Sequence, residues 1–274
     1  MPVTRRRRRL LVGSSALLTV GLLTTGASSP VEPSYALIPL YSDGVALDAD
    51  GVPRLVPVGS EVVDDPDQRA RQDAWLARGS VPGPERYRPM AEQALRDLDA
   101  LVLDNGASLA AGSPYWRYVW PRDASFAAAA LARTGHPDDA HAVLAYLARM
   151  QDLSTVDGVL QARYLPTGTG AVPDARPPQL DGSGWVLWGV AQWYAAAGPG
   201  RGAQLEELRP LVTSAVSAIR DHVDPTTGLS PAFPDYWEVS ERRPTLGTMA
   251  ALLTGARAAA PVLAALGEPP AGDL

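Results

Sequence analysis

Three short segments of this chain combine charged, amide and aromatic side chains in a way that suits a sugar. They are Trp120-Pro121-Arg122-Asp123, Gln179-Leu180-Asp181-Gly182 and Asp235-Tyr236-Trp237-Glu238. A pyranose ring presents hydroxyl groups at its edge and CH groups on its faces, so a site for it needs hydrogen-bonding groups beside flat aromatic rings. The three segments supply both kinds of group, and a carboxyl group among them can serve as a proton donor.

The first segment follows a cluster of aromatic residues in which Trp116 and Trp120 lie four positions apart. Such side chains can stack against a sugar ring, or they can simply pack into the hydrophobic core. Arg122 and Asp123 stand at the start of a predicted helix and also have two interpretations. They can bind hydroxyl groups, or they can form a capping pair.

Glu238 is the best candidate for a general acid. It follows Tyr236 and Trp237 in a segment bounded by prolines, and we expect this aromatic, partly dry environment to raise the pKa of its carboxyl group. The alternative is an ordinary surface carboxylate that pairs with Arg242 or Arg243.

The three segments immediately precede predicted helices. Periodic apolar positions, prolines and glycines predict helices over about 90–105, 123–134, 137–151, 182–197, 205–222 and 245–266. The distance is 59 residues from Arg122 to Asp181 and 57 from Asp181 to Glu238, so a helical hairpin of nearly constant length separates the segments. Because each hairpin returns the chain to its starting side, we expect the three segments to converge on one pocket.

Upstream of the helices, the sequence predicts a small β-rich cap. Apolar runs between Tyr35 and Ser60 alternate with the turn dipeptides Asp43-Gly44 and Asp50-Gly51. A short helix to about Arg78 and a linker over 79–84 follow. We therefore predict a signal peptide over 1–27, a cap and linker over 28–83 and a helical domain over 84–274.

The first residues have the layout of an export signal. Five consecutive arginines, Arg5 to Arg9, precede an apolar run from Leu10 to Leu23 and then small residues. As a helix this run spans about 21 Å, whereas a bilayer core is about 30 Å thick. We expect cleavage, no stable membrane insertion afterwards, and a secreted or cell-surface protein. The paired arginines also permit twin-arginine export, and an uncleaved anchor is the alternative.

Composition excludes several other kinds of protein. Removal of residues 1–27 deletes five arginines and no acidic residue, which changes the formal net charge from −6 to −11. An acidic surface repels phosphate backbones, so we expect no nucleic-acid partner. The chain has no cysteine, and none of its three histidines has a partner at zinc-ligand spacing, so we expect neither a metal site nor a cofactor.

In their order and spacing, the three segments resemble glycoside hydrolase family 15, the glucoamylase and glucodextranase-like enzymes. The resemblance covers roughly residues 85–266. It implies an all-α fold, an α/α toroid of the six-hairpin glycosidase type, and inverting hydrolysis of terminal α-glucosidic bonds in an oligo- or polysaccharide. It also implies roles for the matched residues: Arg122 and Asp123 bind sugar hydroxyls, Trp120 lies against the ring, Gln179 and Asp181 shape the same wall, and Glu238 is the general acid. We include Trp116 and Trp237 among the expected sugar-binding aromatic residues.

The sequence departs from the family pattern in two ways. Val239 stands where many glucoamylases carry a second acidic residue. Only six of the toroid's twelve helices are predicted, and the family's general base belongs to the later half. We therefore expect half a toroid, with exposed faces that favour self-association, and little or no hydrolysis by this chain alone. The alternatives are a non-catalytic carbohydrate-binding protein derived from such an enzyme, and a helical scaffold whose aromatic residues are core.

Overall fold

The computed structural model describes residues 42–59 and 66–270. Backbone proximity divides the chain into Met1–Pro39 and Leu40–Leu274, and all described residues lie in the second unit. The predicted signal peptide lies outside the described residues. The helices are α2 (Pro66–Leu76), α3 (Arg88–Leu101), α4 (Pro121–Arg133), α5 (Pro137–Leu153), α6 (Asp181–Ala197), α7 (Gly202–Glu207), α8 (Arg209–His222) and α9 (Leu246–Leu266), with short 3-10 turns η1 (Glu85–Tyr87), η2 (Pro114–Trp116) and η3 (Pro199–Arg201).

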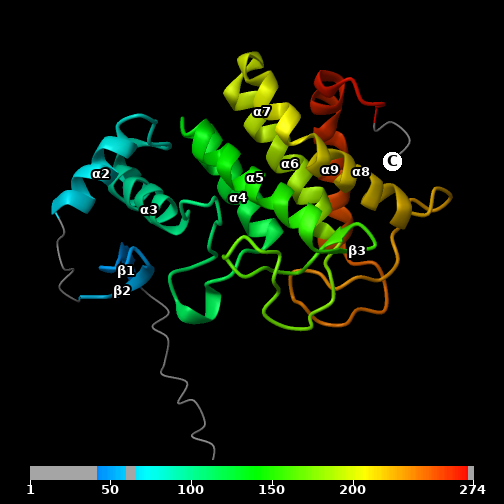
Figure 1. Ribbon diagram of the computed structural model, residues 1–274, viewed down its shortest axis with the longest axis horizontal. Helices are drawn as coiled ribbons and strands as arrows, with labels where there is room; N and C mark the ends of the chain where they lie inside the picture. The colour runs from blue at the N-terminus through cyan, green and yellow to red at the C-terminus, as the bar shows by residue number, and fades with distance from the viewer. Residues whose placement is uncertain (1–41, 60–65, 271–274) are drawn as a thin grey trace, which may run out of the picture. The chain divides into compact units, whose positions relative to one another are not determined.

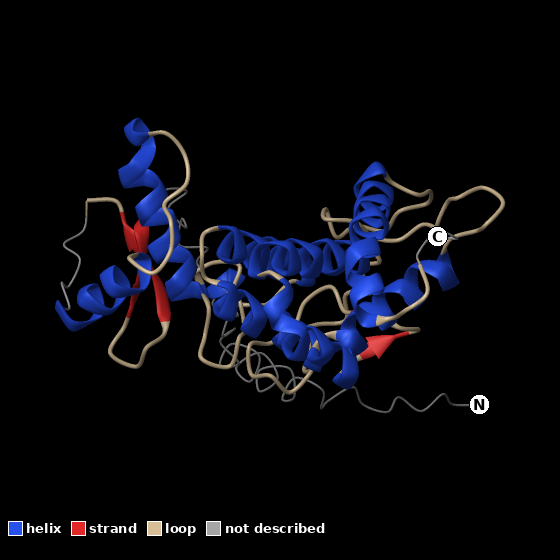
Figure 2. Cartoon of the chain, turned by 90° about the horizontal axis from the view of Figure 1, so that it is seen from above, coloured by secondary structure: helices blue, strands red, loops and turns tan. Residues whose placement is uncertain are grey.

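Strands form only two small antiparallel pairs within the described residues, β1 (Ser42–Leu47) with β2 (Pro53–Pro57) and β3 (Thr155–Val156) with β4 (Val159–Leu160). Helices make up most of the described chain (Figures 1 and 2). The predicted all-α fold with a small β-rich N-terminal cap is therefore confirmed.

The described part of the cap is a β-hairpin. Val45 pairs with Leu55, and the two strands are joined through the predicted turn, where Gly51 has a φ of 73° that favours glycine. Asp48 accepts a hydrogen bond from the backbone N–H of Val52 at 2.9 Å and closes this turn. The backbone N–H of Val45 donates to Asp97 of α3 at 2.8 Å, which joins the hairpin to the helices.

Proline and threonine mark several helix starts. α4 and α5 begin at Pro121 and Pro137, positions where the missing N–H of proline costs nothing. The predicted N-cap of α9 is confirmed, because Thr245 Oγ1 accepts a hydrogen bond from the backbone N–H of Thr248 at 3.3 Å.

The prediction of one continuous helix over 205–222 is wrong. The structure ends α7 at Glu207 and begins α8 at Arg209. The physical reason is Pro210, which has no N–H to continue an earlier helix and whose ring clashes with the preceding turn. It is instead tolerated as the second residue of a new helix.

Three helices, α4, α6 and α9, form the layer that positions the polar segments. α6 lies between the other two and has its most extensive contacts with them (Figure 1). α5 packs against α4 and α6, and α8 packs chiefly against α6. The α6–α9 contact brings the two backbones together. A Cβ atom on Gly184 would lie 2.3 Å from the carbonyl oxygen of Ala251, and one on Gly255 would lie 2.2 Å from that of Gly184. Only glycine fits at such an approach.

An apolar face remains exposed on α8 and α9. It surrounds a hollow of about 300 Å³ whose lining includes Ile219, Val223, Leu246, Met249 and Leu253. α9 is also long and apolar enough to cross a membrane. Those properties are shared by core helices, and α9 packs against α6. Self-association through the open half-toroid stays a prediction.

Candidate active site

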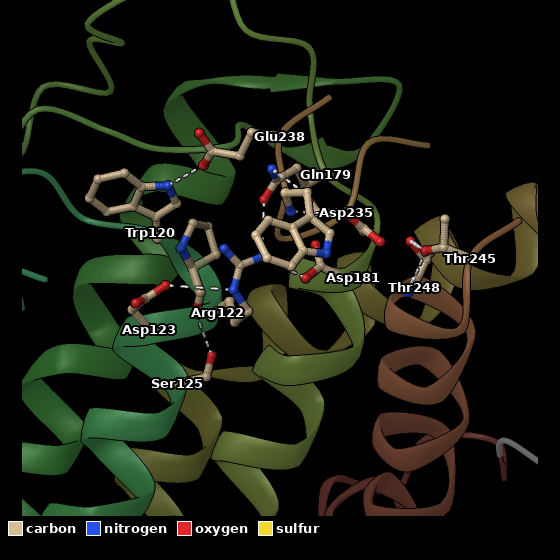
Figure 3. A network of polar contacts seen from close by, with 12 residues as sticks. Trp120, Arg122, Asp123, Ser125, Gln179, Asp181, Asp235, Glu238, Thr245 and Thr248 are labelled. Carbon is tan, nitrogen blue, oxygen red and sulfur yellow. Dashed lines mark hydrogen bonds and ion pairs between the residues drawn. The ribbon is translucent and has the colours of Figure 1, made fainter. Parts of the chain in front are cut away.

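The structure brings the three polar segments together (Figure 3). The indole Nε1 of Trp120 donates to Glu238 Oε1 at 2.6 Å, which joins the first segment to the third. Arg122 Nη1 donates to Asp181 Oδ2 at 2.8 Å, which joins the first to the second. Gln179 Nε2 donates to the backbone carbonyl of Asp235 at 3.0 Å and closes the triangle. The expected convergence of the three segments is thus confirmed, and a pocket shared by all three stays a prediction.

Helix starts place the residues of the first two segments. Trp120 directly precedes α4 and Arg122 is its second residue, while Asp181 is the first residue of α6. A carboxylate at this position interacts favourably with the partial positive charge of the helix N-terminus. Arg122 also donates to Gln179 Oε1 at 3.2 Å, so its guanidinium spans both residues of the second segment.

The third segment is a tight turn in front of α9. The Asp235 carboxylate accepts a hydrogen bond from the backbone N–H of Trp237 at 2.9 Å, and the Asp235 carbonyl accepts one from that of Glu238 at 2.8 Å. Glu238 has a φ of 57°, in the left-handed region that costs a non-glycine residue about 1 kcal/mol or more. Such strained positions are common at active sites and ligand clamps.

The carboxyl groups beside Arg122 have perturbed proton affinity. Asp181 is 1% exposed, and burial raises its pKa although the Arg122 guanidinium opposes that effect. Its Oδ1 is buried without a hydrogen-bond partner. Partial burial also raises the pKa of Asp123, again against the effect of Arg122, whose Nε lies 3.7 Å from Asp123 Oδ2. Asp123 remains half-exposed and can reach a ligand. The N-cap residue of α4, Trp120, makes no side-chain capping hydrogen bond, whereas Asp123 lies in the first turn, where a carboxylate interacts favourably with the helix N-terminus. Its position is thus consistent with both helix capping and ligand binding.

The aromatic residues divide into buried and exposed members. Trp120 is buried, whereas Trp116 is 52% exposed with its ring centroid 5.7 Å from that of Trp120. Trp237 is 70% exposed and lies against Tyr236, with ring centroids 5.4 Å apart. The core interpretation therefore fits Trp120 and does not fit Trp116, and two exposed indoles remain available to stack on a ligand.

Sequence reasoning missed three residues of the site. Arg176 forms an ion pair with Glu238 Oε2, and Asp174 pairs with both Arg176 and Arg163. They lie in the irregular segment between β4 and α6, where no periodicity marks a charged residue as facing the site. The expectation of a dry, aromatic environment for Glu238 is thus incomplete, because a cation touches its carboxylate.

A hollow of about 450 Å³ adjoins Arg122 and Asp123, and its wall includes Leu101, Leu109 and Phe126. It combines apolar surface with two charged groups, as ligand sites commonly do. Within residues 42–59 and 66–270, no group of three or more His, Cys, Asp or Glu side chains is arranged to hold a metal ion.

Comparisons with known proteins show that the chain shares the fold of solved glycosidases. No protein-family model and no curated protein matches the chain. Among solved structures, the chain is similar to a wild-type glycosidase (TM-score 0.51, 22% identity, 76% of this chain and 54% of that one). It is also similar to a glycosidase variant in complex with glucose (TM-score 0.51, 23% identity, 76% and 54%). The chain spans about half the length of these solved glycosidases and shares their fold.

Proposed function

We propose that the site formed by the three segments binds the terminal glucose unit of an α-linked oligo- or polysaccharide, and that the chain is a glucoamylase-like glycoside hydrolase of family 15. The observation that carries this proposal is the convergence of Trp120, Arg122, Asp181 and Glu238 from segments widely separated in sequence. The motif resemblance, the glycosidase fold and the exposed indoles beside the polar groups support it.

Each group has a role in the proposed reaction. Asp123 and the free donors of Arg122 bind hydroxyl groups, while Trp116 and Trp237 stack on sugar faces. Glu238 gives its proton to the glycosidic oxygen as the bond from this oxygen to the anomeric carbon breaks. In an inverting reaction a water attacks that carbon from the opposite face, and a second carboxylate about 6.5–9.5 Å from the acid takes its proton.

We place the base outside the three segments. Their other carboxylates have partners already: Asp123 and Asp181 lie against Arg122, and Asp235 accepts the backbone N–H of Trp237. The resemblance also assigns Asp123 and Asp181 to sugar binding rather than to catalysis, and the Asp235 carboxylate is held within its own turn. The chain should therefore bind sugar and turn it over slowly or not at all.

The test is to titrate the purified chain with maltose and isomaltose in a calorimeter and to assay released glucose from the same samples. Saturable binding with little or no glucose release is expected. Turnover equal to that of a full-length relative would refute the missing base, and the absence of binding to either sugar would refute the site itself.

A non-catalytic carbohydrate-binding protein is the second candidate. It is favoured by the contact of Arg176 with Glu238, because an adjacent cation favours the charged carboxylate over the protonated acid. Glu238→Gln should leave sugar binding intact under either proposal. Only the enzyme gains activity when a polypeptide corresponding to the second half of the toroid is added, and this gain should vanish in Glu238→Gln.

We also propose that residues 1–27 direct export and are removed. An extracellular saccharide substrate and an acidic mature surface are consistent with this location. The N-terminal sequence of the protein recovered from the culture medium tests it, and recovery of the uncleaved chain in membranes would overturn it.

A further inference from the structure

Five side chains at the site form a closed ring of contacts. Trp120 donates to Glu238, Glu238 pairs with Arg176, Arg176 pairs with Asp174, and Asp174 pairs with Arg163. The guanidinium of Arg163 lies 5.2 Å from the centroid of the Trp120 ring, which returns to the starting residue. Of these five residues, the motifs contain only Trp120 and Glu238.

Arg163 forms the buried side of the ring. The Arg163 side chain is only 10% exposed, and its guanidinium is 4.3 Å from the centroid of Tyr118 as well as near Trp120. Such cation–π contacts are strongest where water is excluded. Burial opposes the charge of Asp174, yet the Arg163 and Arg176 guanidiniums hold its pKa below the usual range. Asp174 is therefore an anion fixed in place by a buried cation.

The other side of the ring holds Glu238. Arg176 Nε lies 3.1 Å from Asp174 Oδ2, while its Nη1 contacts Glu238. Because the guanidinium is planar, fixing Nε on Asp174 also fixes the direction of Nη1. Arg176 is 37% exposed, so unlike Arg163 it can swing into solvent without leaving a buried charge.

We propose that Arg176 is a positioning residue: anchored by Asp174, it holds the Glu238 carboxylate in its charged form against Trp120 Nε1 while the site is empty. The functional meaning rests on the proposed role of Glu238 as the proton donor. A sugar that enters must displace Arg176 before Glu238 can carry a proton to the glycosidic oxygen. Charge on the acid is thus coupled to occupancy of the site.

Other charged groups face the same region and must be weighed. They come from the starts of α4 and α6 and from the turn of Glu238 itself, and they are Arg122, Asp123, Asp181 and Asp235. Three of the four are carboxylates, which disfavour a charged Glu238, and the one cation is paired with Asp181. Arg176 is consequently the cation expected to dominate the proton affinity of Glu238.

The test follows the indole N–H resonance of Trp120 through a pH titration of the full chain, because this N–H is bonded to Glu238. Glu238→Gln should abolish the titration and so assign it. Arg176→Gln should move the midpoint upward by about one pH unit or more, since loss of an adjacent cation favours the protonated carboxyl. Arg176→Met, a second neutral variant that keeps the alkyl stem, should give the same shift, and Arg176→Lys should stay closer to wild type.

The matched control is Arg96→Gln, which removes an arginine paired with Asp73 on α2 and should leave the midpoint in place. A dispersed spectrum shows that each variant is folded. Midpoints for Arg176→Gln and Arg176→Met within about 0.2 pH unit of wild type would overturn the proposal, because removal of a cation that touches Glu238 should shift the midpoint by more than this. Because the readout needs neither sugar nor turnover, it stands or fails separately from the proposed function.

Discussion

The indole nitrogen of Trp120 donates a 2.6 Å hydrogen bond to the carboxylate of Glu238, 118 residues later in the chain. This contact ties the start of α4 to the strained turn that precedes α9. Hydrogen bonds to charged groups are shorter and stronger than neutral ones. The bond therefore fixes the position of the candidate acid as well as stabilising the fold.

Replacing Trp120 should lower the free energy of unfolding more than replacing a tryptophan whose indole N–H bonds a neutral acceptor. Trp193 provides the match, because it is also buried and its indole N–H donates to the carbonyl of Pro137 at 2.9 Å. A bond to a charged group contributes about 1.5–3 kcal/mol and a neutral one about 0.5–1.5. Urea unfolding should thus show Trp120→Phe to be about 1 kcal/mol more destabilising than Trp193→Phe. Equal losses would contradict a strong bond to Glu238.

Arg122→Gln should be severely destabilising near neutral pH. It leaves the carboxylate of Asp181 buried without a cation, a change that costs about 3–5 kcal/mol in comparable pairs. The loss should shrink as the pH is lowered, because protonation of Asp181 removes the buried charge.

The control for that experiment is the double variant Arg122→Gln with Asp181→Asn, which has no charge to bury. It should recover part of the lost stability at pH 7 when both are unfolded with urea. If the single and double variants are equally unstable, the ion pair is not the cause.

Gly184→Ala should push α9 away from α6. The new Cβ would meet the Ala251 carbonyl oxygen at 2.3 Å, and overpacking of this kind costs about 1–3 kcal/mol. Gly202→Ala is the matched control, because a Cβ there meets nothing within 4 Å. A fall in melting temperature for Gly184→Ala alone is expected. Comparable melting curves for the two variants would show that the helices tolerate wider spacing.

Asp99 should make the fold less stable as the pH rises. Burial, with a contribution from Asp139, raises its pKa to about 6 in the folded chain. The folded state therefore holds this proton more tightly than the unfolded state, so the free energy of unfolding falls as the pH increases from about 4 to 6. Asp99→Asn should remove this decrease and stabilise the chain at pH 7 by on the order of 1 kcal/mol, after allowance for solvent screening.

That prediction is checked by urea unfolding at pH 3.5 and pH 7. Asp99→Asn should match wild type at the lower pH and exceed it at the higher one. Asp104→Asn, an exposed aspartate shortly after α3, is the control and should change neither value. A variant no more stable than wild type at pH 7 would contradict the raised pKa.

The sequence predicted the parts of the site that local rules determine. Prolines and a threonine cap mark where helices begin, and hairpins of nearly equal length brought residues such as Arg122, Asp181 and Glu238 together. It did not predict Arg176, because a charged residue in an irregular loop carries no periodic signal. The break at Leu208 was missed because the apolar period continues across it, and only Pro210 interrupts the backbone hydrogen bonds.

The most direct test of the central claim is a maltose titration that follows the indole N–H resonances of all seven tryptophans. Trp116, Trp120 and Trp237 lie at the proposed site, whereas Trp75 is stacked on His136 and Trp193 bonds Pro137. The account predicts saturable shifts for the first three and none for the other two. Seven resonances that stay unchanged at saturating maltose, or that all move together, would contradict a sugar site built by these three segments.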